Sequence, residues 1–331
     1  MRTWLVLVQV GALYQAQGQT ALSLKAAEAI AVKNNPRVSV ALLNALAANQ
    51  TPIEIRSAFY PAAYASVTVA GAIERSRIAA GGLNNPLILD RFASGVTISQ
   101  LIADFGRTSH LAESASLRAR AQEETAKATR AEVLLQVDRA YFNALRAQSV
   151  LEVARQTVAT RQLVLEQVTA LEKSKLRSGL DVSFAGVNLA EAKLLLLSAQ
   201  NDMEAAFSEL ALAMGTPQAG KYTLAEENLP AEPAADVTAL VDEALRGRPE
   251  LKQFRLDAEG AKRFADAERD LWRPVISALA AAGATPFHET ALAGRYAAAG
   301  INVSIPVFNG RLFSARRAEA DLRARAAEQR A

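Results

Sequence analysis

Cysteine is absent from the 331 residues, and histidine occurs only twice. A chain without cysteine has no disulfide framework, no catalytic thiolate, no zinc-thiolate site and no lipid attached at an N-terminal cysteine. The two histidines, His110 and His288, lie far apart and lack flanking carboxylates at the spacing of metal ligands. The HExxH, GxSxG and phosphate-loop patterns of common enzymes are missing too. We therefore expect no enzymatic activity, no metal and no cofactor.

Neither charge predominates in the sequence, and aromatic residues are also scarce. The 37 basic and 34 acidic residues leave a net charge of +3, and aromatic residues make up 6% of the chain. No basic run has aromatic residues between its charges, so we expect no nucleic-acid partner. Hydrophobic residues nevertheless form 50% of the sequence. Much of this share is alanine, which suits closely packed helices better than a bulky globular core.

Residues 108–215 form a long stretch without proline that carries two heptad patterns. Spacings of three and four place apolar residues along one face of a helix, as in a coiled coil. Between the patterns, Ser178 and Gly179 interrupt good helix formers, so we predict a long antiparallel helical hairpin that turns there. At about 1.5 Å per residue, the first arm would reach roughly 90 to 100 Å. The patterns comprise Val133, Val137, Ala140, Ala144, Ala147, Leu151, Ala154, Val158, Leu165 and Val168, and then Leu189, Ala192, Leu196, Ala199, Met203, Ala206, Leu210 and Ala213.

Residues 1–18 have the order of a secretory signal peptide. Arg2 precedes an apolar core over residues 4–14, and Ala16-Gln17-Gly18 fits a cleavage site with small residues on either side of the middle position. The apolar core is too short for a membrane-spanning helix. We predict that the protein is exported; a buried first helix is the alternative.

The rest of the chain contains an internal duplication. Pro61 follows Pro36 by 25 positions, and Pro274 follows Pro249 by the same 25. Two strand-like stretches follow each second proline, and then come a turn and an alanine-rich helix. We predict a first repeat over 19–215, a linker over 216–236 and an incomplete second repeat over 237–331. The predicted strands are 64–73, 93–101, 275–283 and 298–307, and the last predicted helix is 312–331.

The motifs, in this order, resemble the TolC-like outer-membrane efflux and secretion channel family. The resemblance implies a mainly α protein with a small β part: a long antiparallel α-helical hairpin, and strands that contribute to a trimeric membrane β-barrel. From composition and alternation alone, a soluble hairpin fits the strand-like stretches equally well. The resembling stretches are AAEAIAVKNNPRV (26–38), AFYPAAYASVTVAG (58–71), ADFGRT (103–108), the hairpin tail from Gly179 to Gly215, EALRGRPEL (243–251) and IPVFNGRLFSARRAEA (305–320).

The same resemblance implies a function and partners. The chain would be the outer-membrane channel subunit of a tripartite efflux or type I secretion system, a passive conduit from the periplasm to the outside. It would lie in the bacterial outer membrane, in contact with lipid, and extend into the periplasm. The implied partners are two further copies in a homotrimer, a periplasmic adaptor and an inner-membrane transporter, and the transporter selects the substrate.

Two departures from the family pattern qualify this expectation. Gly179-Leu180 runs directly into Asp181-Val182, where the family has a further short polar stretch. The sequence also ends at Ala331, before the second helical hairpin that the family has. We therefore expect a truncated chain that does not assemble a sealed channel by itself and whose function is impaired.

Two sets of residues are candidates for functional sites. The hairpin tip would dock an adaptor, with Asp181 as the strongest candidate, although a helix cap explains Asp181 more simply. The strand-to-helix turns end each strand pair, and there Asp104 lies near a helix N-terminus, where negative charge is favoured. The tip residues are Arg177, Ser178, Gly179, Leu180 and Asp181, and the turn residues are Asp104, Gly106, Arg107, Asn309, Gly310 and Arg311.

Two other protein classes also use long helical hairpins. A periplasmic adaptor would flank its hairpin with glycine- and valine-rich β domains, whereas here duplicated helix-strand modules flank it. A coiled-coil scaffold inside the cell would retain residues 1–18.

Overall fold

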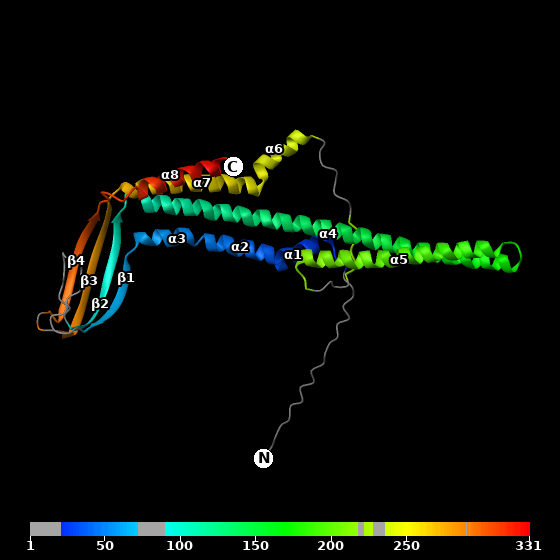
Figure 1. Cartoon of the computed structure of the whole chain (residues 1–331), viewed down its shortest axis with the longest axis horizontal. Helices are drawn as coiled ribbons and strands as arrows, with labels where there is room; N and C mark the ends of the chain where they lie inside the picture. The colour runs from blue at the N-terminus through cyan, green and yellow to red at the C-terminus, as the bar shows by residue number, and fades with distance from the viewer. Residues whose placement is uncertain (1–20, 72–89, 218–221, 228–235, 289, 291) are drawn as a thin grey trace, which may run out of the picture. The chain divides into compact units, whose positions relative to one another are not determined.

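The computed structural model describes residues 21–71, 90–217, 222–227, 236–288, 290 and 292–331 (Figure 1). The predicted signal peptide, the last two residues of the first predicted strand and much of the predicted linker lie outside the described residues. Contacts divide the chain into two units, one of Met1–Val40 with Thr129–Ala235 and one of Ala41–Ala128 with Asp236–Ala331. The elements are α1 (Leu24–Asn34), α2 (Pro36–Ala48), α3 (Thr51–Arg56), η1 (Ser57–Phe59), β1 (Ala62–Ala70), β2 (Arg91–Ala103), α4 (Arg107–Lys173), α5 (Gly179–Met214), α6 (Val237–Gly247), α7 (Pro249–Arg269), η2 (Asp270–Trp272), β3 (Val275–His288), β4 (Arg295–Ser304) and α8 (Leu312–Glu328).

The first unit is built on the antiparallel hairpin of α4 and α5 (Figure 1). Both heptad patterns form its seam: Val133, Val137 and Leu210 are fully or almost fully buried, and the alanines of the seam let the two backbones approach closely. The seam residues Val158, Leu165 and Val168 in the arm toward the tip are half-buried, as are Ala140, Leu196 and Met203 elsewhere in the seam. The predicted hairpin is therefore confirmed, with α4 beginning at Arg107.

The start of the described chain packs onto this hairpin. Ala27 and Ala31 of α1 join the hydrophobic core with Val137 and Leu210. Nearby, Leu22 pairs with Leu224 as a short parallel β-bridge. The buried Tyr141 hydroxyl lies 2.8 Å from the carbonyl oxygens of Leu22 and Ala225, so α4 is tied to both segments of the bridge.

The segment after Asn35 differs from the sequence expectation. The sequence predicts one helix from Val38 to Ala58 with a kink near Pro52, but α2 already ends at Ala48 and α3 begins at Thr51. Pro52 lies in the first turn of α3, where a missing backbone N–H costs no helical hydrogen bond. Proline therefore begins a new helix here and does not bend a continuous one.

In the second unit, the four strands form one antiparallel sheet in the order β1-β2-β3-β4 (Figure 1). Each predicted strand range overlaps one strand, but the ends differ. Since β2 and β3 pair along almost their whole length, β3 continues to His288, beyond the predicted residue 283. β4 instead ends at Ser304, before the predicted residue 307.

Helix α7 packs on α8 in the same unit, and both pack through small residues such as Ala265 and Ala320. The buried Glu268 carboxylate forms a two-point ion pair with Arg316, at 2.8 Å from Nε and 3.0 Å from Nη2. Helices, two strands and a further helix thus follow one another twice, although the first copy has α1, α2 and α3 where the second has α6 and α7. The last helix ends at Glu328, three residues before the predicted end.

Candidate functional site

The sheet of the second unit has one apolar and one polar face. Side chains alternate between faces along a strand, and residues paired in register share a face. Val67 and Val69 of β1 therefore lie on the same face as Val96 and Ile98 of β2. The mainly apolar face holds Val67, Val69, Phe92, Val96, Ile98, Ile276, Ile301 and Val303, with Ser94, Gln100 and Arg295 as polar exceptions. The mainly polar face holds Tyr64, Ser66, Thr68, Thr97, Ser99, Ser277, Asn302 and Tyr296, with Leu101, Val275 and Leu279 as apolar exceptions.

Neither face is covered within the described residues. Val67 and Ile301 on the apolar face are 67% and 75% exposed, and Tyr64 on the polar face is 67% exposed. A sheet with water on both sides would not keep valine and isoleucine on one face. This alternation is instead what a sheet between lipid and water requires.

Two glycines shape the polar face. Gly95, Gly283 and Tyr296 follow one another across β2, β3 and β4 in register. A Cβ atom on either glycine would overlap the Tyr296 ring or its hydroxyl. The missing side chains therefore let the Tyr296 ring lie flat against the sheet.

Both edges of the sheet are open in the part of the chain that the structure describes. β1 pairs only with β2, and β4 pairs only with β3. An open edge exposes a row of backbone N–H and C=O groups that have no hydrogen-bond partner in lipid. The sheet is therefore incomplete as a membrane structure until other strands pair with β1 and β4.

The turn from β2 to α4 is held by Asp104, as the structure places Asp104, Gly106 and Arg107 together. The Asp104 carboxylate accepts hydrogen bonds from the backbone N–H groups of Gly106, at 3.2 Å, and Thr108, at 2.7 Å. Phe105 and Gly106 have φ values of 55° and 109°. A positive φ is sterically unfavourable for Phe105, whereas Gly106 adopts it without this cost.

Asp270 of η2 holds this turn from the second repeat. Its buried carboxylate lies 2.8 Å from His110 Nδ1 and 3.0 Å from Arg273 Nε. Arg273 also donates a hydrogen bond to the carbonyl oxygen of Phe105, the strained residue of the turn. Sequence reasoning missed this contact because its members come from opposite repeats, and no spacing in the sequence signals it.

The second strand-to-helix turn uses Asn309, Gly310 and Arg311. Gly310 and Arg311 have φ values of 60° and 71°. Trp272 packs edge to face on Phe313 of α8, with ring centroids 5.5 Å apart. This turn lacks a carboxylate in the position of Asp104, so it is held more by packing than by charge.

The hairpin tip is capped and exposed. Ser178 and Asp181 form a capping box, in which the Ser178 hydroxyl accepts from the Asp181 N–H and the Asp181 carboxylate accepts from the Ser178 N–H. The backbone and hydroxyl hydrogen bonds from Ser178 lower the pKa of Asp181. Arg177 lies 3.9 Å from the Asp181 carboxylate. Leu176 and Leu180 are 72% and 64% exposed, so the tip presents apolar side chains beside one ion pair.

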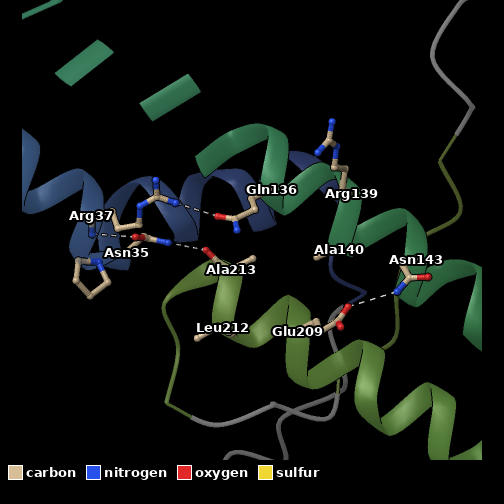
Figure 2. A pocket seen from close by; sticks show the side chains of 10 residues that line it. Asn35, Arg37, Gln136, Arg139, Ala140, Asn143, Glu209, Leu212 and Ala213 are labelled. Carbon is tan, nitrogen blue, oxygen red and sulfur yellow. Dashed lines mark hydrogen bonds between the residues drawn. The ribbon is translucent and has the colours of Figure 1, made fainter. Parts of the chain in front are cut away.

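A groove of about 640 Å³ lies in the first unit, where α1 meets α2 beside the end of α5 (Figure 2). Asn35 is buried there; its amide donates to the carbonyl oxygen of Ala213 at 2.9 Å and its side-chain oxygen accepts from the Arg37 N–H at 2.9 Å. Arg37 in turn donates to Gln136 of α4 at 3.3 Å. The sequence signals only a helix stop at Asn34-Asn35-Pro36, but Asn35 also joins α5 to the start of α2.

No cluster in the described residues has the composition of a metal site, counted as three or more histidine, cysteine or acidic side chains. By length and composition alone, α5 is the one described helix that could cross a membrane. Its seam packs on α4, while Leu194 and Leu195 on other faces are 68% and 64% exposed. The exposed leucines are thus a second apolar surface of the protein, apart from the sheet.

Comparison with protein families matches residues 29–216 to the family described as outer membrane efflux protein. Comparison with curated proteins finds no match. Among solved structures, a membrane protein from Pseudomonas aeruginosa is similar with a TM-score of 0.73 and 20% identity, over 92% of this chain and 71% of that one. The outer membrane protein VceC from Vibrio cholerae gives 0.72 and 18%, over 92% and 74%. The Campylobacter jejuni CmeC outer membrane channel gives 0.74 and 15%, over 93% and 66%.

Proposed function

The chain belongs to the outer membrane efflux protein family, and on that premise we propose that it is a channel subunit that conducts solutes passively from the periplasm to the outside. Its place is the bacterial outer membrane, and its family and fold are those of a channel. The strongest support for this proposal is the sheet, which has one apolar face, one polar face and two open edges. The protein performs no bond chemistry in this role.

The sheet would form the membrane part of the channel. Its apolar face would contact lipid, and its polar face would line the water-filled conduit. The backbone groups of β1 and β4 would pair with strands of neighbouring copies, because closure removes edges that lipid cannot satisfy. Three copies, each giving the four observed strands, would close the sheet part of the homotrimer that we propose, and the expected impairment of the sealed channel stays a prediction.

The helical hairpin would continue the conduit toward the inner membrane. The exposed leucines of α5 would be covered by helices of neighbouring subunits, since apolar surface of this extent marks an interface. The exposed tip from Arg177 to Asp181 would meet a periplasmic adaptor, and through it an inner-membrane transporter of an efflux or type I secretion system. The transporter would select the substrate.

The adaptor and scaffold alternatives explain the hairpin but not the sheet. Neither class needs a valine and isoleucine face opposite a serine and threonine face. The channel proposal accounts for both features of the protein.

Cross-linking tests the edge pairing, and the absence of cysteine makes the protein a ready background. A variant with Ser66→Cys in β1 and Gly300→Cys in β4, treated in membranes with a bifunctional thiol reagent, should give cross-linked dimers and trimers and no larger species. Either single variant alone should give far less product, since like edges do not meet in a ring. Equal products from the single variants, or a ladder beyond the trimer, would refute the proposal.

A further inference from the structure

Two carboxyl groups face each other where α1 packs on α4. Glu28 follows the buried Ala27 on α1, and Asp138 follows the buried Val137 on α4. Both side chains are half-buried, and they interact with each other as hydrogen-bonding partners. Packing of the two helices thus brings together two groups of like charge, far apart in the sequence.

One oxygen of this pair has no donor. Asp138 Oδ1 is buried and has no hydrogen-bond partner among the described residues. Two ionised carboxylates only accept hydrogen bonds, whereas a protonated carboxyl group donates one. A proton on Glu28 therefore turns a repulsive contact between two carboxylates into a hydrogen bond to Asp138.

We propose that Glu28 binds a proton, which it donates in a hydrogen bond to Asp138, and that binding of this proton tightens the docking of α1 on the α4–α5 hairpin. This pair of carboxyl groups lies outside the sheet, the turns and the tip, and the proposal does not depend on the channel function. Binding of the proton would make the packing of α1 on the hairpin sensitive to the pH of the compartment.

The surroundings do not neutralise the pair. Lys25 on α1 lowers the pKa of Glu28, but its effect is smaller than that of Asp138. From the segment beside α1, the Glu227 carboxylate accepts a hydrogen bond from the Leu24 N–H and adds negative charge near Tyr141. The α5 residues that share this core, Ala206, Leu210, Ala213 and Met214, carry no charge.

The pH dependence has a definite sign. Burial, the charge of Asp138 and the hydrogen bond to it raise the pKa of Glu28 above its usual value. The folded protein therefore binds this proton more tightly than the unfolded chain does. Stability gained from the pair is present at acidic pH, below the unfolded pKa, and is lost as the pH rises through the folded pKa.

Hydrogen exchange on the full chain in detergent would measure the docking of α1. The amides of Leu24–Asn34 should be better protected at acidic pH than at neutral pH, after correction for intrinsic exchange. The gain is at most about tenfold for every pH unit that separates the folded and unfolded pKa of Glu28. Glu28→Gln should abolish this pH dependence, because an amide donates to Asp138 at any pH. The matched control Glu191→Gln changes an exposed carboxylate of α5 and should leave it intact.

Infrared difference spectra between the two pH values detect the protonated carboxyl group directly. The wild-type protein should show a protonated-carboxyl band that titrates above the range of ordinary carboxylates and that disappears in both Glu28→Gln and Asp138→Asn. If Glu28→Gln fails to fold, Asp138→Asn and the wild-type spectrum still decide the question. Wild-type pH dependence that persists in the substituted proteins, or a wild-type spectrum without the band, would overturn the proposal.

Discussion

At the residue scale, a few buried polar side chains hold the joints between elements. Asp270 connects the start of α4 with the turn that leads into β3 through His110 and Arg273. Asn35 connects α1, α2 and the end of α5 in the other unit. Each acts through hydrogen bonds to partners that are distant in the sequence, so the effect of replacing it is local to one joint.

Replacement of Asp270 by alanine should destabilise the second unit. Removing one member of a buried ion pair costs about 3 to 5 kcal/mol in fully buried cases, but His110 and Arg273 are 30% and 54% exposed and regain water. We therefore expect a loss of about 2 kcal/mol in the free energy of unfolding, measured by denaturant titration. Asp266→Ala, which removes only surface ion pairs of α7, should cost under about 1 kcal/mol. Equal losses in the two variants would contradict the role of Asp270.

Replacement of Asn35 by alanine should loosen the joint beside the groove in Figure 2. The change leaves the buried carbonyl group of Ala213 without its donor and removes the acceptor for the Arg37 N–H. We expect a loss of about 1 to 3 kcal/mol in the free energy of unfolding, with faster hydrogen exchange at the end of α5. The neighbouring Asn34 is exposed, so Asn34→Ala should change the free energy by no more than about 0.5 kcal/mol. A larger effect at Asn34 than at Asn35 would refute this assignment.

At the element scale, the hairpin depends on its seam along most of its length and on its cap at the tip. The capping box satisfies the first N–H groups of α5. Ser178→Ala should reduce the stability of the tip by about 1 kcal/mol, seen as faster hydrogen exchange in the first turn of α5. Ser183→Ala, an exposed serine one turn further on, serves as the matched control and should leave that exchange nearly unchanged.

The same cap predicts a pH dependence for the tip. Because the hydrogen bonds from Ser178 lower the pKa of Asp181, the carboxylate stabilises the cap at pH values above its unfolded pKa. This contribution is lost as the pH falls through the folded pKa. Exchange at the tip should therefore speed up in acid, which is opposite to the response proposed for α1. An unchanged acid response in Asp181→Asn would contradict the assignment.

Sequence patterns predict elements better than they predict joints. The seam of the hairpin follows from spacing, because an apolar stripe such as Val133 to Leu151 has to meet another stripe. Strand ends and the break between α2 and α3 depend on the pairing of strands and on backbone hydrogen bonds that residue alternation does not encode. The contact between His110 and Asp270 and the pair of Glu28 and Asp138 arise only after distant helices pack, so no local spacing reveals them.

At the scale of the whole molecule, the sheet determines which surroundings the protein requires. One face is apolar, the other is polar, and both edges are open in the described strands. These three properties together require lipid on one side, water on the other and further strands at the edges. A soluble role for the sheet would leave exposed valine and isoleucine side chains without a partner.

Face-specific labelling of β1 tests this central claim most directly. Ser66→Cys and Val67→Cys place a fluorophore at neighbouring positions on opposite faces of one strand, in a protein that otherwise has no cysteine. In reconstituted membranes, a quencher attached to lipid tails should quench the label at position 67, and a water-soluble quencher should quench the label at position 66. The same response of both labels to both quenchers would contradict the account.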